Sequence, residues 1–290
     1  MSTEITMPGV YNLTSEEYHG FGPVPERLGG SLSASGAKKL LPPNCPAMFD
    51  YERHHGRPPK ATFDFGHAAH ELVLGIGAGI VSVDANDWRT KAAQEAKKAA
   101  HAEGKVPLLA DVVAVVEAMA DAIRAHPIAS ALLNPENGKP EQAMFRQDEH
   151  EGVWLRSMLD WLPDSGDGRM IVPDYKTAVS ASPERFRKAA ADYGYHQQAA
   201  WYIDMVLALG LADEAAFVFV VQEKTAPYLV TVFEPDAQAL RIGREMNRQA
   251  IDIYASCQSS GVWPGYSTEV ELLSLPPWYV RQQEFSEEIQ

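Results

Sequence analysis

The sequence predicts an α/β fold in which a mixed central sheet is flanked by helices and interrupted by a helical insert. Three strand-like segments follow one another between residues 141 and 178, and two more lie between residues 214 and 235. Helical patterns precede the first group of strands, separate the two groups and follow the second. This order of helix, three strands, helices, two strands and helix indicates an α/β sandwich with helices on the faces of the sheet.

The N-terminal part of the chain is expected to hold short helices joined by loops. Residues 10–60 are rich in proline and glycine, and helical segments begin there after Ser33 and after Asn44. A loop then leads into a helix over residues 64–74, because Asp64 is a candidate N-cap that stands before an apolar run.

Two helical patterns of different character come next. Residues 87–104 are strongly charged and rich in alanine, whereas residues 111–126 are amphipathic with apolar residues at helical spacing. Together they predict a helical insert, or lid, at about residues 85–135.

Turn residues then separate a series of strands and helices. Residues 141–163 predict a hairpin that turns at residues 149–152, and a second turn leads into residues 169–178, so that three strands form a meander. The remaining elements are a helix from residue 183, a helix over 195–210 that Gly210 ends, strands at 214–224 and 226–235, and a long helix over 236–261.

Composition limits the classes of function that the chain can have. With 290 residues, of which 46% are hydrophobic, it can bury a large core, and no apolar run is long enough to span a bilayer, so we expect a cytoplasmic protein. Its two cysteines, Cys45 and Cys257, exclude a four-thiolate iron–sulfur cluster. A net charge of −14 argues against a uniformly basic surface that coats nucleic acid, but it permits a local basic channel and a carboxylate site for a divalent cation.

The segment MIVPDYKTA, residues 170–178, carries the most informative polar residues. Asp174 and Lys176 are two residues apart on an apolar strand, so their side chains share one face. Asp160 stands on the preceding strand, and antiparallel pairing across the intervening turn would bring it to the same edge. An isolated D-x-K pattern is more often a surface ion pair, and that alternative stays open at this point.

Two buried carboxylates beside an ammonium group are costly unless they have partners. A divalent cation removes the repulsion between the carboxylates, and hard oxygen ligands suit Mg²⁺ or Mn²⁺. A neighbouring lysine can orient or deprotonate a water molecule, or neutralise charge that develops on a phosphate. The pattern therefore favours metal-dependent chemistry on a phosphate ester.

Four elements of the sequence resemble the PD-(D/E)XK nuclease superfamily, and in particular RecE-like exonuclease domains of phages and prophages. Two of these elements, Asp160 and the later Asp174-Tyr175-Lys176, together resemble the superfamily signature in its D-x-K form. The other two elements are a G-x-x-x-H pattern at Gly66 and His70 and a Q-x-x-x-Y pattern at Gln198 and Tyr202. The resemblance covers nearly the whole chain and is weakest over residues 85–135.

The resemblance implies a restriction-endonuclease-like core and a role for each of these residues. A metal ion would be held by His70, Asp160, Asp174 and the backbone carbonyl of Tyr175. Lys176 would position the attacking water, and Gln198 and Tyr202 would steady the site or contact the DNA backbone. A satisfied core histidine and a packing tyrosine are the alternatives for His70 and Tyr202. The domain boundaries that follow are one nuclease domain over 1–290, with an N-terminal region 1–62, a core at 63–84 and 136–260, the insert, and a tail at 261–290.

Two further features have two interpretations each. Ser33 is a good N-cap, and Ser35 and Lys38 behind it could form an anion site similar to the T-A-S element of lambda-type exonucleases, which faces a terminal phosphate; ordinary capping explains the serines equally well. Glu141 could add a carboxylate to the site, although exposure at the surface is the simpler expectation.

The resemblance implies a Mg²⁺-dependent exonuclease, with Mn²⁺ as a possible substitute, that digests duplex DNA ends in the 5′→3′ direction for phage-type recombination. It also implies a ring-shaped trimer or tetramer and a single-strand annealing protein as partner, in a bacterial or phage-infected cell. A RecB-like nuclease selective for single strands or for DNA structure is one alternative. A DNA-end-binding protein without catalysis is the other.

Overall fold

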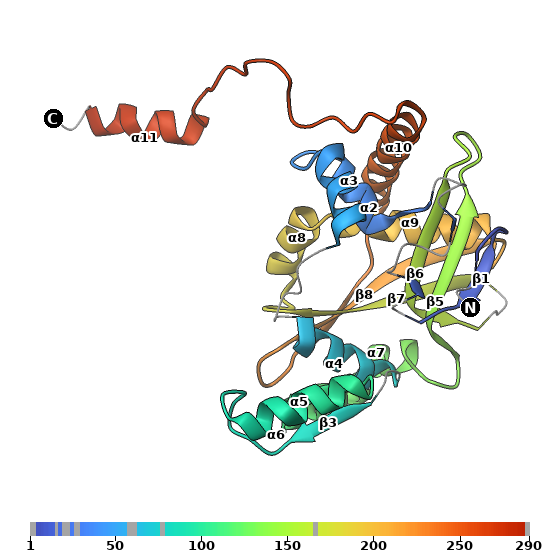
Figure 1. Ribbon diagram of the computed structural model, residues 1–290, viewed down its shortest axis with the longest axis vertical. Coiled ribbons are helices and arrows are strands. Elements are labelled where there is room, and N and C mark those ends of the chain that lie inside the picture. The colour runs from blue at the N-terminus through green and yellow to red at the C-terminus, as the bar shows by residue number, and fades with distance from the viewer. Residues whose placement is uncertain are drawn as a thin grey trace.

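Three sheets organise the part of the chain that the computed structural model describes (Figure 1). The described residues are 4–14, 17–18, 24–25, 30–56, 63–75, 79–164 and 168–287. Helices lie on both sides of the two larger sheets, which confirms the predicted α/β architecture of mixed sheet and flanking helices.

The first sheet has the strand order β1-β5-β6-β2. Its centre is the antiparallel hairpin of β5 (Gly138–Gln147) and β6 (Trp154–Pro163), which turns where the sequence predicts. Asp148 closes this turn, since its backbone N–H donates to the Val153 carbonyl at 2.8 Å. Two short strands that the sequence analysis did not identify, β1 (Gly9–Asn12) and β2 (Leu32–Ser33), complete the sheet.

The second sheet consists of β7 (Arg169–Ala178), β8 (Glu214–Glu223) and β9 (Val230–Phe233). β8 is antiparallel to β9 and parallel to β7, and the chain passes from β7 to β8 through α8 (Pro183–Asp192) and α9 (Tyr195–Ala208).

The predicted meander of three consecutive strands is therefore wrong at its last step. β6 and β7 lie in different sheets, although they touch. β8 is apolar and buried on both faces, so it needs a hydrogen-bonded strand along each edge, and β7 and β9 supply them. Where a β6 ladder would run, the N–H of Tyr175 instead donates to the Asp160 carboxylate at 2.9 Å.

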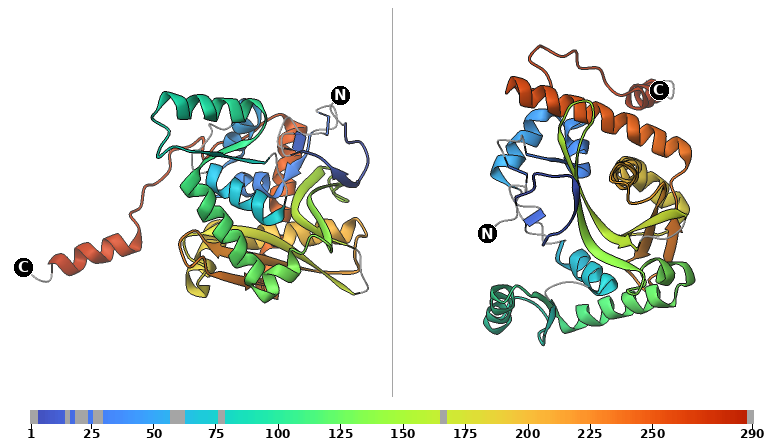
Figure 2. Two further views of the ribbon diagram at one scale, coloured as in Figure 1. Left: turned by 90° about the horizontal axis from the view of Figure 1, so that it is seen from below. Right: turned by 90° about the vertical axis from the view of Figure 1, so that its right-hand side faces the viewer.

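The sheet of β7, β8 and β9 separates two apolar layers (Figure 2). On one side β7 and β8 pack through Val172, Phe217 and Phe219 against α9 and neighbouring helices. These neighbours are α2 (Ala34–Leu40), α3 (Pro46–His55) and the long α10 (Ala237–Ser260). On the other side Tyr175 and Val220 face α4 (Phe63–Leu74) and α6 (Ala110–Ala125). Alternate residues of one strand thus serve the two layers, as the twofold period of a strand requires.

The insert contains more than helices. α5 (Lys91–Ala102), α6 and α7 (Pro127–Leu132) are accompanied by two parallel strands, β3 (Ile80–Val83) and β4 (Val106–Leu109). Each strand has four residues, which is too short for a period to be recognised. β3, which the predicted boundaries place in the core, pairs with β4 of the predicted insert.

Helix boundaries differ slightly from the expected ones because of their caps. The Thr90 hydroxyl accepts a hydrogen bond from the Ala93 N–H at 3.2 Å, so α5 begins at Lys91 and not at residue 87. α4 begins at Phe63, which places Asp64 inside the helix and makes the predicted cap wrong.

The chain leaves the packed layers after α10. Gly261, at φ 70°, ends this helix in the left-handed conformation. Residues 261–276 then run outward to α11 (Pro277–Glu287), which stands apart from the two apolar layers (Figure 1). None of the helices in the described ranges combines the length and the hydrophobicity that a bilayer-spanning segment needs.

Candidate active site

Asp174 and Lys176 lie on one face of β7, as their spacing predicts. Lys176 Nζ is 2.6 Å from Asp174 Oδ2, and the Asp174 side chain is only 2% exposed. A surface ion pair would leave both groups in water, so this alternative is wrong for Asp174. A carboxylate buried to this degree needs a compensating partner.

Asp160 and His70 reach the same end of β7 from β6 and from α4. One Asp160 oxygen, Oδ2, accepts the Tyr175 N–H and lies 3.0 Å from His70 Nε2. The His70 ring is one quarter exposed and is tilted toward the Tyr175 ring at a centroid distance of 6.2 Å. His70 is therefore not an isolated core histidine, because its ring is held against a carboxylate of the predicted site.

Gln198 connects α9 to the same cluster. Its Nε2 donates to Asp174 Oδ1 at 2.8 Å, so this oxygen is occupied. Tyr202, one turn later, packs edge-on against Phe217 with ring centroids 5.5 Å apart. Burial raises the pKa of Tyr202 well above its usual value, against the opposing effect of a hydrogen bond with Gln198. Tyr202 thus combines the packing role and the contact with the site that the sequence left as alternatives.

Charges within the cluster shift one another's pKa values. Burial raises the pKa of Asp174 to about 6, and the charge of Asp160 adds to this, while Lys176 opposes it. Burial also acts on Asp160, but His70, Lys176 and the Tyr175 N–H outweigh it and lower the pKa. Burial disfavours protonation of His70, but the Asp160 carboxylate outweighs that effect and raises the pKa above its usual value.

The donor set suits a divalent cation, although the side chains are paired with one another. Within the described ranges, no three His, Cys, Asp or Glu side chains converge as metal ligands. Asp174 Oδ2 is buried, and its one close polar neighbour among the described residues is the Lys176 ammonium, 2.6 Å away. Two carboxylates and an imidazole match the ligands of Mg²⁺ or Mn²⁺ sites. A cation bound here would neutralise the negative charge of Asp160 and Asp174.

The serine-rich start of α2 shows ordinary capping. Ser33 Oγ accepts the Gly36 N–H at 3.1 Å and lies 3.1 Å from Ser35 Oγ, while the Ser35 side chain is exposed. Lys38, one turn later, extends toward the cluster on β7. Burial and the charge of Lys176 lower the pKa of Lys38 to about 8, while Asp174 opposes this shift.

Two signals were missed or misjudged in the sequence. Glu141 lies inside β5, at the position opposite Asp160, because its neighbours Pro140 and Gln142 pair with Trp161 and Leu159. It is half-buried and has a positive φ of 45°, a strained backbone for a non-glycine residue. Tyr195, whose ring centroid is 5.6 Å from both Lys38 Nζ and Lys176 Nζ, was not identified from the sequence.

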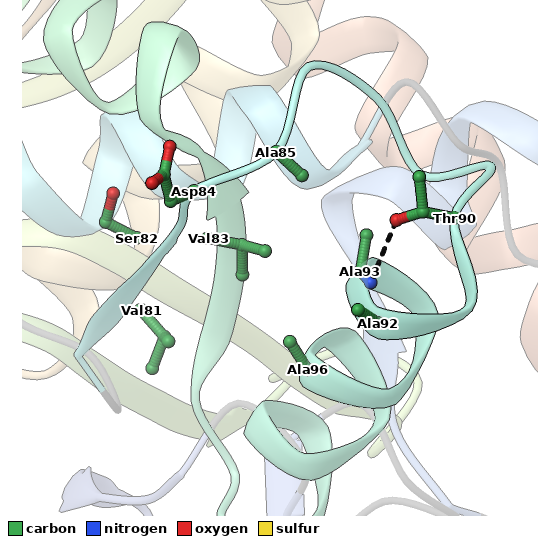
Figure 3. A pocket seen from close by; sticks show the side chains of 9 residues that line it. All are labelled: Val81, Ser82, Val83, Asp84, Ala85, Thr90, Ala92, Ala93 and Ala96. Atoms are coloured by element: carbon green, nitrogen blue, oxygen red, sulfur yellow. Dashed lines mark hydrogen bonds between the residues drawn. The ribbon is translucent and has the colours of Figure 1, made fainter.

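A cavity of about 340 Å³ lies far from these residues, in the insert between β3 and α5 (Figure 3). Its lining is formed mostly by small side chains, among them Ala92, Ala93 and Ala96. The Thr90 hydroxyl caps α5 by accepting a hydrogen bond from the Ala93 N–H, which is the dashed line in Figure 3. Asp84 is its one charged side chain, so the cavity lacks the paired groups that mark the β7 cluster.

Comparison with known proteins agrees with this geometry. The family model of a PDDEXK-like domain of unknown function (DUF3799) matches residues 33–276. The chain belongs to this family. The match places it in the PD-(D/E)XK superfamily. No curated protein matches the sequence significantly.

Two solved structures are similar to this chain at low sequence identity. A candidate exonuclease from Eubacterium rectale is 14% identical, with a TM-score of 0.60 over 93% of this chain and 98% of that one. A phage-related exonuclease from Haemophilus somnus is 12% identical over 80% of this chain and 96% of that one, with a TM-score of 0.33. The first likeness establishes the fold.

Proposed function

We propose that this protein is a metal-dependent exonuclease that hydrolyses phosphodiester bonds from the ends of duplex DNA. The observation that carries the proposal is the buried Asp174 carboxylate, which stands beside Lys176, with Asp160 and His70 at the same edge. Membership of a PDDEXK-like family and the exonuclease descriptions of two similar structures support it.

In this proposal His70, Asp160, Asp174 and the Tyr175 carbonyl hold Mg²⁺ or Mn²⁺. The bound ion supplies an acidified water and neutralises charge on the scissile phosphate. Gln198 fixes the rotamer of Asp174 through its hydrogen bond to Oδ1, so that Oδ2, which is paired with Lys176, is the oxygen that would face the ion. Asp160 is held in turn by the Tyr175 N–H.

Lys176 acts on the reacting groups and not on the fold alone. Its ammonium lies at the edge of the cluster with a side chain 23% exposed, so that DNA can reach it. From there it orients the attacking water and opposes the negative charge that grows on the phosphate. Tyr202 and Gln198 steady this arrangement from α9, and Ser35 and Lys38 contact the phosphates of the DNA strand from α2.

Digestion of end-labelled substrates tests which strand end the enzyme prefers and whether it prefers duplex or single-stranded DNA. A linear duplex labelled at its 5′ ends should release labelled mononucleotides at once in Mg²⁺, whereas a duplex labelled at its 3′ ends should release label late. EDTA should stop both reactions. Faster digestion of single strands than of duplex would favour the RecB-like alternative, and binding of ends without any digestion would favour the non-catalytic one.

Metal affinity should depend on pH in a predictable direction. The pKa of Asp174 is raised to about 6 and that of His70 lies above its usual value, so protons compete with the ion near and below these values. Calorimetric titration with Mn²⁺ should show affinity rising between about pH 6 and about pH 8, by up to about tenfold per pH unit for each proton released. His70→Ala should weaken binding and reduce this dependence, and equal Mn²⁺ affinity in His70→Ala and the wild type would remove His70 from the site.

A closed homo-oligomer, a trimer or tetramer, fits processive digestion, since enclosure keeps an enzyme on its substrate without slow-release contacts. The segment beyond α10 exposes Leu272, Leu273 and Trp278 at 92%, 89% and 62%, and exposed apolar side chains of this kind often mark interfaces. Light scattering at micromolar concentration should report three or four chains. A monomer, both with and without DNA, would contradict the proposal, and pull-down with a single-strand annealing protein would test the expected partner.

A further inference from the structure

The aromatic ring of Tyr195 lies where two lysines from distant parts of the chain meet. Gly194, at φ 62°, turns the chain into α9, so that Tyr195 is the first residue of this helix. Lys38 Nζ from α2 and Lys176 Nζ from β7 each lie 5.6 Å from the centroid of its ring. The ring itself is held by Phe186 and Phe219, with centroids 5.7 and 5.5 Å away.

Lys38 differs from Lys176 in its charged neighbours. Lys176 has Asp174 at 2.6 Å, whereas no ion pair joins Lys38 to a carboxylate among the described residues. Burial lowers the pKa of Lys38, and the repulsion between its ammonium group and that of Lys176 lowers it further. The face of an aromatic ring carries partial negative charge and attracts cations, and this attraction strengthens as water is removed. The ring, like the nearby charge of Asp174, therefore offsets the repulsion, and unlike Asp174 it lies equally close to both ammonium groups.

The ring, and not the hydroxyl, makes these contacts. Within the described residues the Tyr195 hydroxyl takes part in no hydrogen bond, and a Cβ at Gly194 would lie 3.4 Å from the alkyl chain of Lys38. The Lys38 side chain thus runs along the start of α9 and ends over the ring. An ordinary packing role would require neither lysine to point there.

We infer that Tyr195 is a positioning residue whose ring holds the ammonium groups of Lys176 and Lys38 together, so that both meet phosphates of the DNA strand being cut. This inference rests on the proposed nuclease function. A phosphodiester anion joining the two ammonium groups removes the repulsion between them. Tyr195 then acts on cleavage through Lys176 and on substrate binding through Lys38.

The geometry can be tested without metal or DNA. In protein labelled with ¹³C at the lysine ε-carbon, an aromatic ring this close should move two lysine signals away from the main group by its ring current. Tyr195→Phe should keep both displaced signals, and Tyr195→Leu should return both to the main group. Tyr193→Leu is the matched control, because Tyr193 is exposed and its ring lies 5.7 Å from that of Tyr195. Displaced signals that persist in Tyr195→Leu would overturn the inference.

The effect on function is measured by single-turnover cleavage in Mg²⁺ and DNA binding in Ca²⁺. Tyr195→Phe should cleave within about twofold of the wild type, and Tyr195→Leu about tenfold more slowly, as expected for the loss of a desolvated cation–π contact. Phenylalanine with one, two and three ring fluorines at position 195 keeps the packing but weakens the ring face, and the rate should fall with each fluorine.

Three results would each overturn the inference. The first is a cleavage rate of Tyr195→Leu equal to that of the wild type. The second is a cleavage rate of Tyr195→Phe as low as that of Tyr195→Leu, which would assign the role to the hydroxyl. The third is a cleavage rate that does not change with the number of ring fluorines. The fluorinated series decides the matter if Tyr195→Leu does not fold. A folded wild type with both displaced lysine signals but without cleavage would instead show that the proposed nuclease function has failed.

Discussion

Lys176→Ala should reduce single-turnover cleavage of a labelled duplex by a factor of about 10²–10³. The interaction that Lys176 makes with developing charge is concentrated in the transition state, so its loss lowers turnover more than it weakens substrate binding. The affinity for DNA ends, measured in Ca²⁺, should fall far less, because phosphate contacts elsewhere carry most of the salt-dependent binding.

Lys188→Ala provides the matched control for this substitution. Lys188 is an exposed lysine of α8, and its removal should leave cleavage unchanged. If Lys176 were only an ion-pair partner, its removal would cost less than about 1 kcal/mol of stability and leave cleavage near normal. Near-wild-type cleavage by a folded Lys176→Ala protein would therefore remove Lys176 from the reaction and contradict the assignment of the D-x-K pattern.

Asp174→Asn should weaken Mn²⁺ binding by more than about 100-fold, and cleavage should become undetectable. The substitution removes the negative charge but keeps the shape of the side chain. The carbonyl oxygen of the asparagine can still accept the hydrogen bond from Gln198, which is 2.8 Å long in the wild type. Loss of metal binding would then reflect the missing carboxylate and not a rearranged site.

Calorimetric titration with Mn²⁺ measures this effect directly. Asp164→Asn is the control, since Asp164 is an exposed carboxylate just beyond β6 and only four residues from Asp160. It should bind Mn²⁺ as the wild type does. Unchanged affinity in Asp174→Asn, with a melting temperature equal to that of the wild type, would place the ion elsewhere.

Local patterns were sufficient to predict most elements and the central part of the site. The hairpin of β5 and β6 was evident from alternating residues around a turn, and the ends of α9 and α10 from Gly210 and Gly261. The shared face of Asp174 and Lys176 follows from the twofold period of a strand, whatever the strand pairs with.

Long-range pairing could not be predicted in the same way. The sequence gives no indication that β7 pairs in parallel with β8, forty-five residues later by the Arg169–Glu214 register, and not with its predecessor β6. The expected meeting of Asp160 with β7 was nevertheless correct, because the Asp160 side chain takes the Tyr175 N–H in place of a backbone ladder. The contact between Asp160 and β7 was thus predicted correctly, although the predicted pairing of β6 with β7 in one sheet was wrong.

Residues whose role depends on three separate elements were the hardest to predict. Tyr195 matters only because α2, β7 and α9 converge, and no spacing in the sequence relates Lys38 to Lys176. His70 was identified by the resemblance of its motif, while its contact with Asp160 depends on how α4 packs beneath the sheet.

Digestion of a linear duplex by the wild type and by Asp174→Asn, purified in parallel, is the most direct test of the central claim. In Mg²⁺ the wild type should release mononucleotides from the ends, and EDTA should abolish the release. The Asp174→Asn protein should release none under either condition, which excludes a contaminating nuclease. Intact DNA after incubation with folded wild type in both Mg²⁺ and Mn²⁺, or equal digestion by the two proteins, would contradict the account.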